Sequence, residues 1–279
     1  MNRRNRIFST ISTLPMILFT LIFVGGPLVM MVILSFSAQD GWGYSPDFTP
    51  ENYAALFTEQ YLNVFLTSLS LACLSTALVI LIGYPFGLTA ALSPDRFRRF
   101  YMSAQMIPYW VNSLLRLYGW IIILRANGIL DKILMGLHLT EEPLKLLYTY
   151  PAVLVGRVYV LLPFMFTSVY QVAEKLDLSL AEAARDLGAS GTKAFFTVIL
   201  PLTAPGLKTG VILTFIPSMG LFFIAQILGG NKIVLVGSLI EELLMKAHNQ
   251  PMAAALSVIL MILTGAVCLI LMRKAKHER

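Results

Sequence analysis

The sequence predicts an all-α integral membrane protein with six transmembrane helices and with both termini in the cytoplasm. Three observations favour this fold: 57% of the 279 residues are hydrophobic and only 13% are charged, long apolar runs follow one another, and basic residues gather in alternate connections. A soluble domain of this size would have too little polar surface with such a composition. A lipid bilayer is therefore the expected solvent for most of the chain.

Each apolar run is long enough to cross a bilayer, because about 20 helical residues span about 30 Å of hydrocarbon. The six runs lack Asp and Glu and cover residues 14–36, 64–92, 101–124, 151–173, 206–228 and 251–272. We expect residues 14–273 to form one six-span domain, residues 1–13 a cytoplasmic N-terminus and residues 274–279 a cytoplasmic tail. Gly83 and Gly87 form a small-xxx-small pair, which predicts close helix packing.

Orientation follows from the basic residues, because short connections rich in Lys and Arg stay in the cytoplasm during insertion. They gather before the first run, in the second and fourth connections, and after the sixth run: Arg3, Arg4, Arg6, Arg96, Arg98, Arg99, Lys175, Arg185, Lys193, Lys208, Arg273, Lys274, Lys276 and Arg279. These segments are predicted to face the cytoplasm. The formal charge of +6 follows from this topology and does not indicate nucleic-acid binding.

The longest polar segment on the predicted cytoplasmic side covers residues 174–205. Ser179 followed by Glu182 is a capping-box pattern, the alanines after it favour a helix, and Gly188 supplies a stop. Pro201 is then expected to break the path into the fifth run. The segment therefore predicts a short exposed helix followed by a rigid turn.

Residues 182–201 read EAARDLGASGTKAFFTVILP. This resembles the EAA loop of bacterial ABC importer permeases, in which these three residues, a following Gly and a distal Leu-Pro recur between the antepenultimate and penultimate spans. The resemblance implies a type I ABC importer permease-like fold whose coupling helix docks into a separate ATPase subunit. An alanine-rich helix with two acids is also a common solvated face. The resemblance assigns the docking to Glu182, Ala183, Ala184, Asp186, Gly188, Leu200 and Pro201.

Four more segments narrow the family: GYPF at 83–86, PYWVNSLLRLYG at 108–119, YVLLPF at 159–164 and MGLFF at 219–223. They resemble the PotB-type permeases of spermidine/putrescine importers in the bacterial inner membrane. The resemblance implies a polyamine cargo, an extracytoplasmic polyamine-binding protein, a second homologous permease subunit and two ATPase subunits. Neighbouring branches carry opines, phosphonates or iron, which leaves another small solute as an alternative. Gln226 stands where an Asp that would hold an amine is expected.

The source of energy is expected to lie outside this chain. No Gly-x-x-x-x-Gly-Lys-Ser/Thr loop occurs, so ATP and Mg are assigned to the partner ATPase. An ion-coupled secondary carrier, the main alternative, relies on buried carboxylates, which the apolar runs lack. A membrane enzyme would need a catalytic cluster. We expect no enzyme activity, no catalytic residue, no metal site and no cofactor on this chain.

Polar and aromatic side chains of the third and fifth runs are the candidate translocation path, since a polar stripe in lipid needs a protein-lined cavity. Organic cations bind aromatic rings with about 0.5–2 kcal/mol per contact. Helix packing is the alternative role for each residue. Arg116 lies too deep to snorkel and needs a partner or water, whereas Arg157 is expected to snorkel. The candidates are Tyr109, Trp110, Asn112, Ser113, Arg116, Tyr118, Phe222, Phe223 and Gln226. On a continuous helix Tyr109, Asn112, Ser113 and Arg116 share one face.

Overall fold

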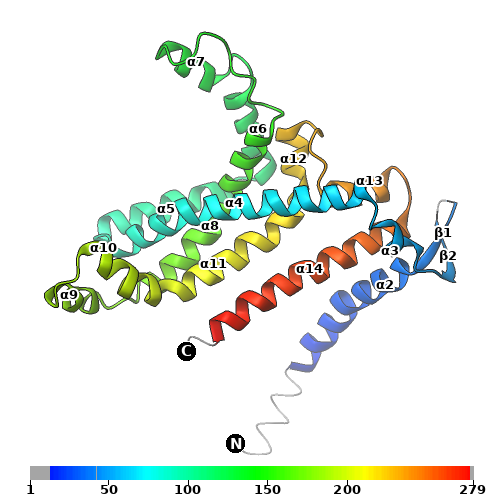
Figure 1. Cartoon of the computed structure of the whole chain (residues 1–279), viewed down its shortest axis with the longest axis horizontal. Coiled ribbons are helices and arrows are strands. Elements are labelled where there is room, and N and C mark those ends of the chain that lie inside the picture. The colour runs from blue at the N-terminus through cyan, green and yellow to red at the C-terminus, as the bar shows by residue number, and fades with distance from the viewer. Residues whose placement is uncertain (1–12, 42, 277–279) are drawn as a thin grey trace, which may run out of the picture. The chain divides into compact units, whose positions relative to one another are not determined.

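The computed structural model describes residues 13–41 and 43–276, with all their side chains except those at positions 46, 109, 271 and 273–276. The basic clusters predicted at the two termini lie mostly outside this part of the chain. Residues 13–20 are helical. The elements that follow them, with η for π-helical turns, are η1 (Leu21–Gly25), α2 (Gly26–Ser35), β1 (Ser37–Asp40), β2 (Gly43–Phe48), α3 (Glu51–Ala55), α4 (Glu59–Leu92), α5 (Asp95–Trp110), α6 (Ser113–Leu124), α7 (Ile129–Gly136), α8 (Tyr150–Ala173), α9 (Ser179–Asp186), α10 (Gly191–Ala194), η2 (Phe195–Ile199), α11 (Leu200–Gly220), α12 (Phe222–Gly229), α13 (Val236–Met245) and α14 (Gln250–Lys276) (Figure 1).

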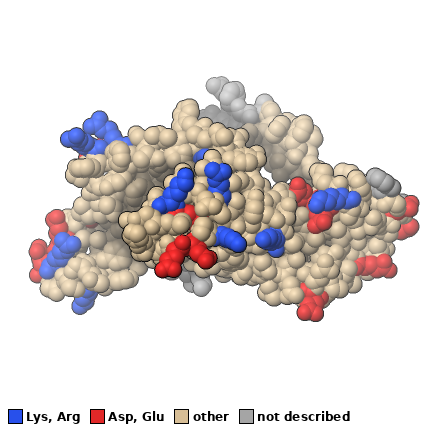
Figure 2. Space-filling view, turned by 90° about the horizontal axis from the view of Figure 1, so that it is seen from above, with Lys and Arg blue, Asp and Glu red and all other residues tan. Residues whose placement is uncertain are grey.

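The described residues contain six helical segments that are long and apolar enough to cross a membrane: Thr13–Ser35, Glu59–Leu92, Ser113–Gly136, Tyr150–Ala173, Gly191–Gly220 and Gln250–Ile270. The prediction of an all-α protein with six spans is confirmed, although the third and fifth segments have other bounds than expected. Figure 2 shows that uncharged residues cover most of the face seen there. Such a surface suits lipid, in which exposed charges are costly.

Contacts divide the chain into two compact units, of which the first contains Met1–Asn63 and Leu239–Leu263. Here α2 runs into an antiparallel hairpin of β1 and β2, which the sequence did not lead us to expect. The side-chain amide of Asn52 donates to the carbonyl oxygens of Ser35 and Ser37 at 3.1 and 2.8 Å. These bonds fix α3, which follows the hairpin, to the end of the first span and the first residue of β1.

The second unit contains Val64–Ser238 and Thr264–Arg279. Its centre is α8, which glycines of α4 and α11 approach closely (Figure 1). A Cβ at Gly87 of α4 would lie 2.9 Å from the carbonyl oxygen of Phe166, and one at Gly206 of α11 would lie 2.8 Å from that of Ser168. The packing role predicted for Gly87 is therefore confirmed. Small residues at such contacts let helices associate where lipid removes the hydrophobic drive.

Polar side chains tie α4 to α11 in the same unit. The hydroxyl groups of Tyr84 and Thr203 lie 2.8 Å apart in a buried hydrogen bond. Around them Val79, Leu161 and Met165 are fully buried. Helices α4, α8 and α11 thus form the packed centre from which the functional elements extend.

Candidate coupling and translocation sites

Helix α9 is the short helix that the sequence predicts between the fourth and fifth spans. Its first turn is capped by Asp177, whose Oδ1 accepts a hydrogen bond from the backbone amide of Ser179 at 3.0 Å. The capping box predicted at Ser179 and Glu182 is wrong, because Ser179 is already helical and the residue before it, Leu178, has no side-chain cap. Hydrogen bonds from the Ser179 hydroxyl and amide lower the pKa of Asp177.

Helix α9 ends at Asp186, and Gly188 two residues later stops it, as predicted. Gly188 has a φ of +85°, a left-handed conformation that glycine adopts without a steric penalty. Its amide donates to the carbonyl of Arg185 at 2.8 Å, and the amide of Ala189 donates to that of Ala184 at 3.0 Å. These are the two bonds of a Schellman motif. No heavy atom lies within 4 Å of a Cβ at Gly188, so a larger residue would bring backbone strain without a clash.

The outer surface of α9 combines acidic and apolar groups. Glu182, Ala183 and Asp186 are exposed, and Ala184 is half-buried. Glu182 and Asp186 share a face because they are four residues apart on a helix. Leu187, which sequence reasoning did not include, is 90% exposed at the end of the helix. This surface can offer carboxylates and an apolar side chain to one partner.

Helix continues from α10 into α11, over Gly191–Gly220. The rigid turn predicted at Pro201 is therefore wrong. Pro201 lies in the first turn of α11, and the preceding π-helical turn closes with the amide of Leu200 bonded to the carbonyl of Phe195. The wider turn accommodates the ring and the missing amide of the proline. Leu200 and Pro201 thus belong to a rod that leads into the fifth span.

The third predicted span is broken in the middle. Helix α5 ends at Trp110, Val111 is extended with a ψ of 133°, and α6 begins at Ser113. Asn112 caps α6, because its Oδ1 accepts a hydrogen bond from the amide of Leu114 at 2.8 Å. The single polar face predicted across this region is therefore wrong. The backbone of Tyr109 belongs to α5, and its side chain lies outside the described residues.

Arg116 on α6 has partners that the sequence did not identify. Its Nη2 donates to the hydroxyl of Ser113 at 2.9 Å, and its Cζ lies 5.6 Å from the ring centroid of Tyr159 on α8. The ring of Trp120 meets the same tyrosine edge-on at 5.6 Å. Tyr159 opens one of the family segments, but only the fold shows that it joins these two α6 residues. Trp110 and Tyr118, in contrast, are exposed.

The fifth predicted span is also broken, at Leu221, where a ψ of 63° separates α11 from α12. Phe222, Phe223 and Gln226 lie on the short α12 and are half-buried. Phe223 packs against the apolar cluster that joins α6, α8 and α12, in which Trp120 also takes part. The fold thus brings Phe223 of the fifth span to the same apolar cluster as Trp120 of the third.

Arg157 of α8 lies beside the break in the fifth span. It is 1% exposed, and its Nη2 donates to the carbonyl oxygen of Ser218 and, at 3.0 Å, to its hydroxyl. The prediction that Arg157 snorkels is therefore wrong. The helix leaves its regular path at Leu221, so the carbonyl of Ser218 needs another donor, which the guanidinium supplies.

Asp131 on α7 is a buried carboxylate that lies beyond the predicted apolar runs. It is 2% exposed, and its two oxygens accept hydrogen bonds from the backbone amides of Asn127 and Leu144 at 2.7 and 3.1 Å. Both bonds fix the loops around α7. This arrangement indicates a structural role, because a proton relay needs a carboxylate whose partners can change.

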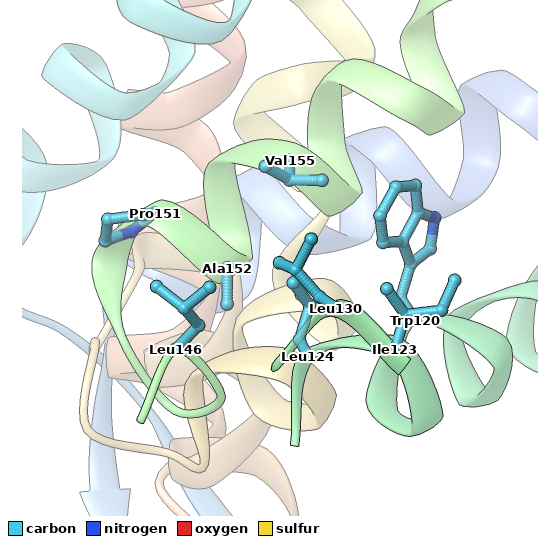
Figure 3. A pocket seen from close by; sticks show the side chains of 8 residues that line it. All are labelled: Trp120, Ile123, Leu124, Leu130, Leu146, Pro151, Ala152 and Val155. Carbon is cyan, nitrogen blue, oxygen red and sulfur yellow. The ribbon is translucent and has the colours of Figure 1, made fainter. Parts of the chain in front are cut away.

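A cavity of about 220 Å³ lies among residues of α6, α7 and α8 in the second unit (Figure 3). None of its lining side chains is ionisable, and only Trp120 belongs to the polar and aromatic group described above. A multiply charged amine would find no carboxylate here, so this cavity does not account for binding of a cation. Its lining residues are Trp120, Ile123, Leu124, Leu130, Leu146, Pro151, Ala152 and Val155.

Comparisons with known proteins agree with this architecture. The family of binding-protein-dependent transport system inner membrane components matches residues 83–277. The spermidine/putrescine transport system permease protein PotB of Haemophilus influenzae is 38% identical over 273 residues, which cover 98% of this chain and 96% of that protein. The inner membrane ABC transporter permease protein YdcU of Escherichia coli is 29% identical and covers 89% of this chain and 83% of its own.

Solved structures extend the likeness to the fold. A chain of the bacterial ABC transporter that imports the acidic polysaccharide alginate matches 99% of this chain and 96% of its own, with a TM-score of 0.76 and 15% identity. A chain of the MetNI methionine ABC transporter in an inward-facing conformation matches 80% of this chain and 100% of its own, with a TM-score of 0.60 and 17% identity. At these identities the likeness concerns the fold alone, and the type I ABC importer permease-like fold is confirmed. Because the family match covers more than half of its length, this chain belongs to the binding-protein-dependent transport system inner membrane components and is a multi-pass permease.

Proposed function

We propose that this chain is the transmembrane permease subunit of an ATP-driven importer that carries polyamines such as spermidine and putrescine into a bacterial cell. The cargo rests on the 38% identity to PotB, which extends over 98% of this chain. The coupling to ATP rests on one structural observation. Helix α9 is exposed, has a cap at each end, and is followed by the long helical segment Gly191–Gly220 that leads into the membrane. The chain itself is not an enzyme in this proposal.

The proposed assembly contains a second homologous permease, two ATPase subunits that hold ATP and Mg, and an extracytoplasmic polyamine-binding protein. Glu182 and Asp186 would meet basic groups of the ATPase, while Leu187 would enter an apolar part of its cleft. Gly188 keeps the end of α9 closed, and Leu200 and Pro201 pass its displacement into α11. A motion caused by a ligand on another subunit meets the definition of allosteric coupling.

The proposed path uses the side chains around the two broken spans. Trp110 and Tyr118 are exposed in the single chain, so they are available to a path shared with the second permease. Phe222, Phe223 and Gln226 add rings and an amide from α12. Asn112 and Ser113 are engaged in capping α6 and in binding Arg116. None of these path residues is a carboxylate, so in this proposal they contact the amine through their rings and the amide of Gln226.

The test of coupling is uptake of labelled spermidine and putrescine by the whole complex in proteoliposomes, measured together with ATP hydrolysis. The intact complex should take up polyamine only with ATP and the binding protein present. Gly188→Val should lower uptake, because valine is strained at a φ of +85°. Gly191→Val is the matched control, since Gly191 also has open space around a Cβ and no positive φ. Equal uptake by the two variants would remove α9 from the coupling.

The test of the path is the Trp110→Ala variant. Its uptake should slow about two- to thirtyfold, the range that a lost cation–π contact of about 0.5–2 kcal/mol represents. Phe97→Ala removes another exposed ring of α5 and should leave uptake unchanged. Unchanged flux in the Trp110 variant, with the complex assembled, would exclude its ring from the path.

Two alternatives remain testable in the same preparation. A secondary carrier would take up polyamine from an ion gradient without ATP, but both oxygens of the buried Asp131 already accept backbone hydrogen bonds. A permease for another small solute would show ATP-dependent uptake of an opine, phosphonate or iron, and excess spermidine would not compete. Competition by spermidine at low concentration would instead support the polyamine assignment.

A further inference from the structure

Arg98 joins the start of α5 to the end of α8 in a way that the proposed coupling does not yet use. Its guanidinium forms an ion pair with Glu174. Its Nε donates to the hydroxyl of Tyr170 at 2.6 Å, and its Cζ lies 5.7 Å from the centroid of that ring. One arginine thus makes three kinds of contact with the last turn of the fourth span.

The residues that Arg98 binds lie next to the coupling helix. Glu174 is the C-cap residue of α8, and α9 begins at Ser179. Tyr170 is 5% exposed and stacks on Phe166, with the two ring centroids 6.0 Å apart. The end of α8 is therefore held by a buried ring on one side and by an ion pair on the other. A displacement of α9 reaches this end of α8 within a few residues.

Helix α5 can carry such a displacement along its length. Arg98, Tyr101 and Gln105 lie on one face, because they are three and four residues apart. The side-chain amide of Gln105 donates to the carbonyl of Pro163 and to the hydroxyl of Thr167, both at 3.3 Å. This second contact with α8 lies two turns after the first. Helix α5 then ends at Trp110, next to the break that leads to Asn112 and Arg116.

We propose that Arg98, Tyr170 and Glu174 link the coupling helix to the third span, and that Arg98 is a positioning residue for transport. The inference rests on the proposed function, because it assumes that a partner ATPase displaces α9. In this link α8 and α5 move together when α9 moves, and the broken third span changes its position at the path. The fifth span receives the same displacement directly, through the rod from Gly191 to Gly220.

The neighbouring arginine separates this role from a general effect of basic residues. Arginines in this connection also set the orientation of the chain in the membrane. Arg99 is exposed, and its Nε donates only within α5, to the carbonyl oxygen of Asp95 at 3.3 Å. Arg99→Gln removes the same charge from the same connection and leaves the link intact. It is therefore a matched control for Arg98→Gln.

The Arg98–Glu174 pair is suited to mutation because it is one-third exposed at both side chains. Such pairs contribute little to stability, so the variants should fold and assemble. The Arg98→Gln complex should hydrolyse ATP at its normal rate. Its rate of polyamine uptake should fall about five- to 150-fold, the range that a lost coupling between two sites represents. The number of polyamine molecules carried per ATP is thus the quantity that falls. A role in folding alone would lower both activities together.

The experiment compares Arg98→Gln, Glu174→Gln, Arg99→Gln and the exchanged pair Arg98→Glu with Glu174→Arg, each in the complete complex in proteoliposomes. We expect low transport per ATP in the first two, normal transport in the third and partial recovery in the exchanged pair. Equal behaviour of Arg98→Gln and Arg99→Gln, or an exchanged pair as slow as Arg98→Gln, would overturn the link. Absence of ATP-dependent uptake in the unmodified complex would instead reject the proposed function.

Discussion

Asp177 is the residue on which the first turn of α9 depends. The hydroxyl of Ser179, and to a smaller extent its backbone amide, donate to the Asp177 carboxylate and lower its pKa below the ordinary value of 3.8. A carboxyl with a lowered pKa stabilises the folded state above its ordinary pKa, and this contribution disappears as the pH falls through the lowered value. The charge of the α9 cap is therefore fully present at neutral pH and is lost as the pH falls below 3.8.

We predict that Asp177→Ala frays the first turn of α9 at neutral pH. Hydrogen exchange at the amide of Ser179 should become faster, because this donor loses its side-chain acceptor. Asp177→Asn is the control and should keep most of the protection, since asparagine caps helices as well as aspartate does. In the unmodified protein, protection should weaken as the pH falls below 3.8 and should approach that of the asparagine variant, because protonation removes the charge but leaves a carbonyl oxygen that accepts. Equal exchange rates in the two variants would show that this side chain does not cap α9.

Single residues differ in how far the sequence reveals their role. Gly188 was predictable as the end of α9, because a helix commonly stops where only glycine adopts a positive φ. Arg157 was not, since its partner Ser218 lies 61 positions away and meets it only after α8 and α11 have packed. Ser179 was predicted as the cap in place of Asp177 because two capping patterns overlap within residues 177–182. A local pattern such as a helix stop can be predicted from the sequence, whereas a contact between two helices can be identified only once the fold is known.

At the scale of elements, close contact between α4 and α8 sets the geometry of the second unit. A Cβ at Gly87 would lie 2.9 Å from a backbone oxygen of α8, and backbone cannot move aside as a flexible side chain can. At Gly83 the obstacle is the side chain of Met165 at 3.0 Å. The two glycines therefore differ in how much substitution they tolerate.

We predict that Gly87→Ala destabilises the purified complex by about 1–3 kcal/mol, the usual cost of an overpacked core. Gly83→Ala should cost less, because its close contacts, at 3.0 Å to the Cβ and Cγ of Met165, include no backbone atom. Gly119→Ala on α6 is the control and should be neutral or slightly stabilising, since its Cβ meets nothing within 4 Å and alanine favours helix. Thermal denaturation in detergent measures all three. A Gly87 variant as stable as the Gly119 variant would contradict this account of the contact.

The spans themselves were predictable as elements, but their interruptions were not. Hydropathy found all six segments because lipid requires about 20 apolar residues in each. The breaks at Val111 and Leu221 lie inside apolar sequence, where periodicity gives no signal. At Pro201 the error was the reverse: a break was predicted, but the π-helical turn before it keeps the helix continuous. Backbone hydrogen bonding, which hydropathy does not report, decides these cases.

At the scale of the whole molecule, the topology predicted from basic residues has a direct chemical test. Asp47 belongs to the hairpin after the first span, and Lys193 belongs to α10 after the coupling helix. Both side chains are exposed. Positive residues in short connections favour the cytoplasmic side, which assigns Lys193 to the inside and Asp47 to the outside.

We predict that, after replacement of Cys73 and Cys268 by alanine, a membrane-impermeant maleimide labels Asp47→Cys in intact spheroplasts. Lys193→Cys should react only after the membrane is permeabilised. Both single-cysteine variants need to support uptake, which shows that they are folded. Labelling of Lys193→Cys from outside would reverse the orientation and place α9 away from any cytoplasmic ATPase.

The whole fold also shows where composition stops being informative. A chain with 57% hydrophobic residues is recognisable as a membrane protein at once, and the alternating charges give its orientation as a prediction. The hairpin after the first span was missed because a short strand pair near the membrane has no apolar stripe of its own. The position of α3, which follows it, depends on Asn52 and two backbone carbonyls, which only the folded chain brings together.

The rod from Gly191 to Gly220 has a mechanical consequence. At 1.5 Å per residue it is about 45 Å long, more than the thickness of the hydrocarbon core. Gly206 and Gly210, near its midpoint, lie in close contact with α8. A helix that pivots at this contact moves its two ends in opposite directions. In the proposed coupling, one displacement by the partner ATPase would therefore move the inner and the outer end of the fifth span at the same time.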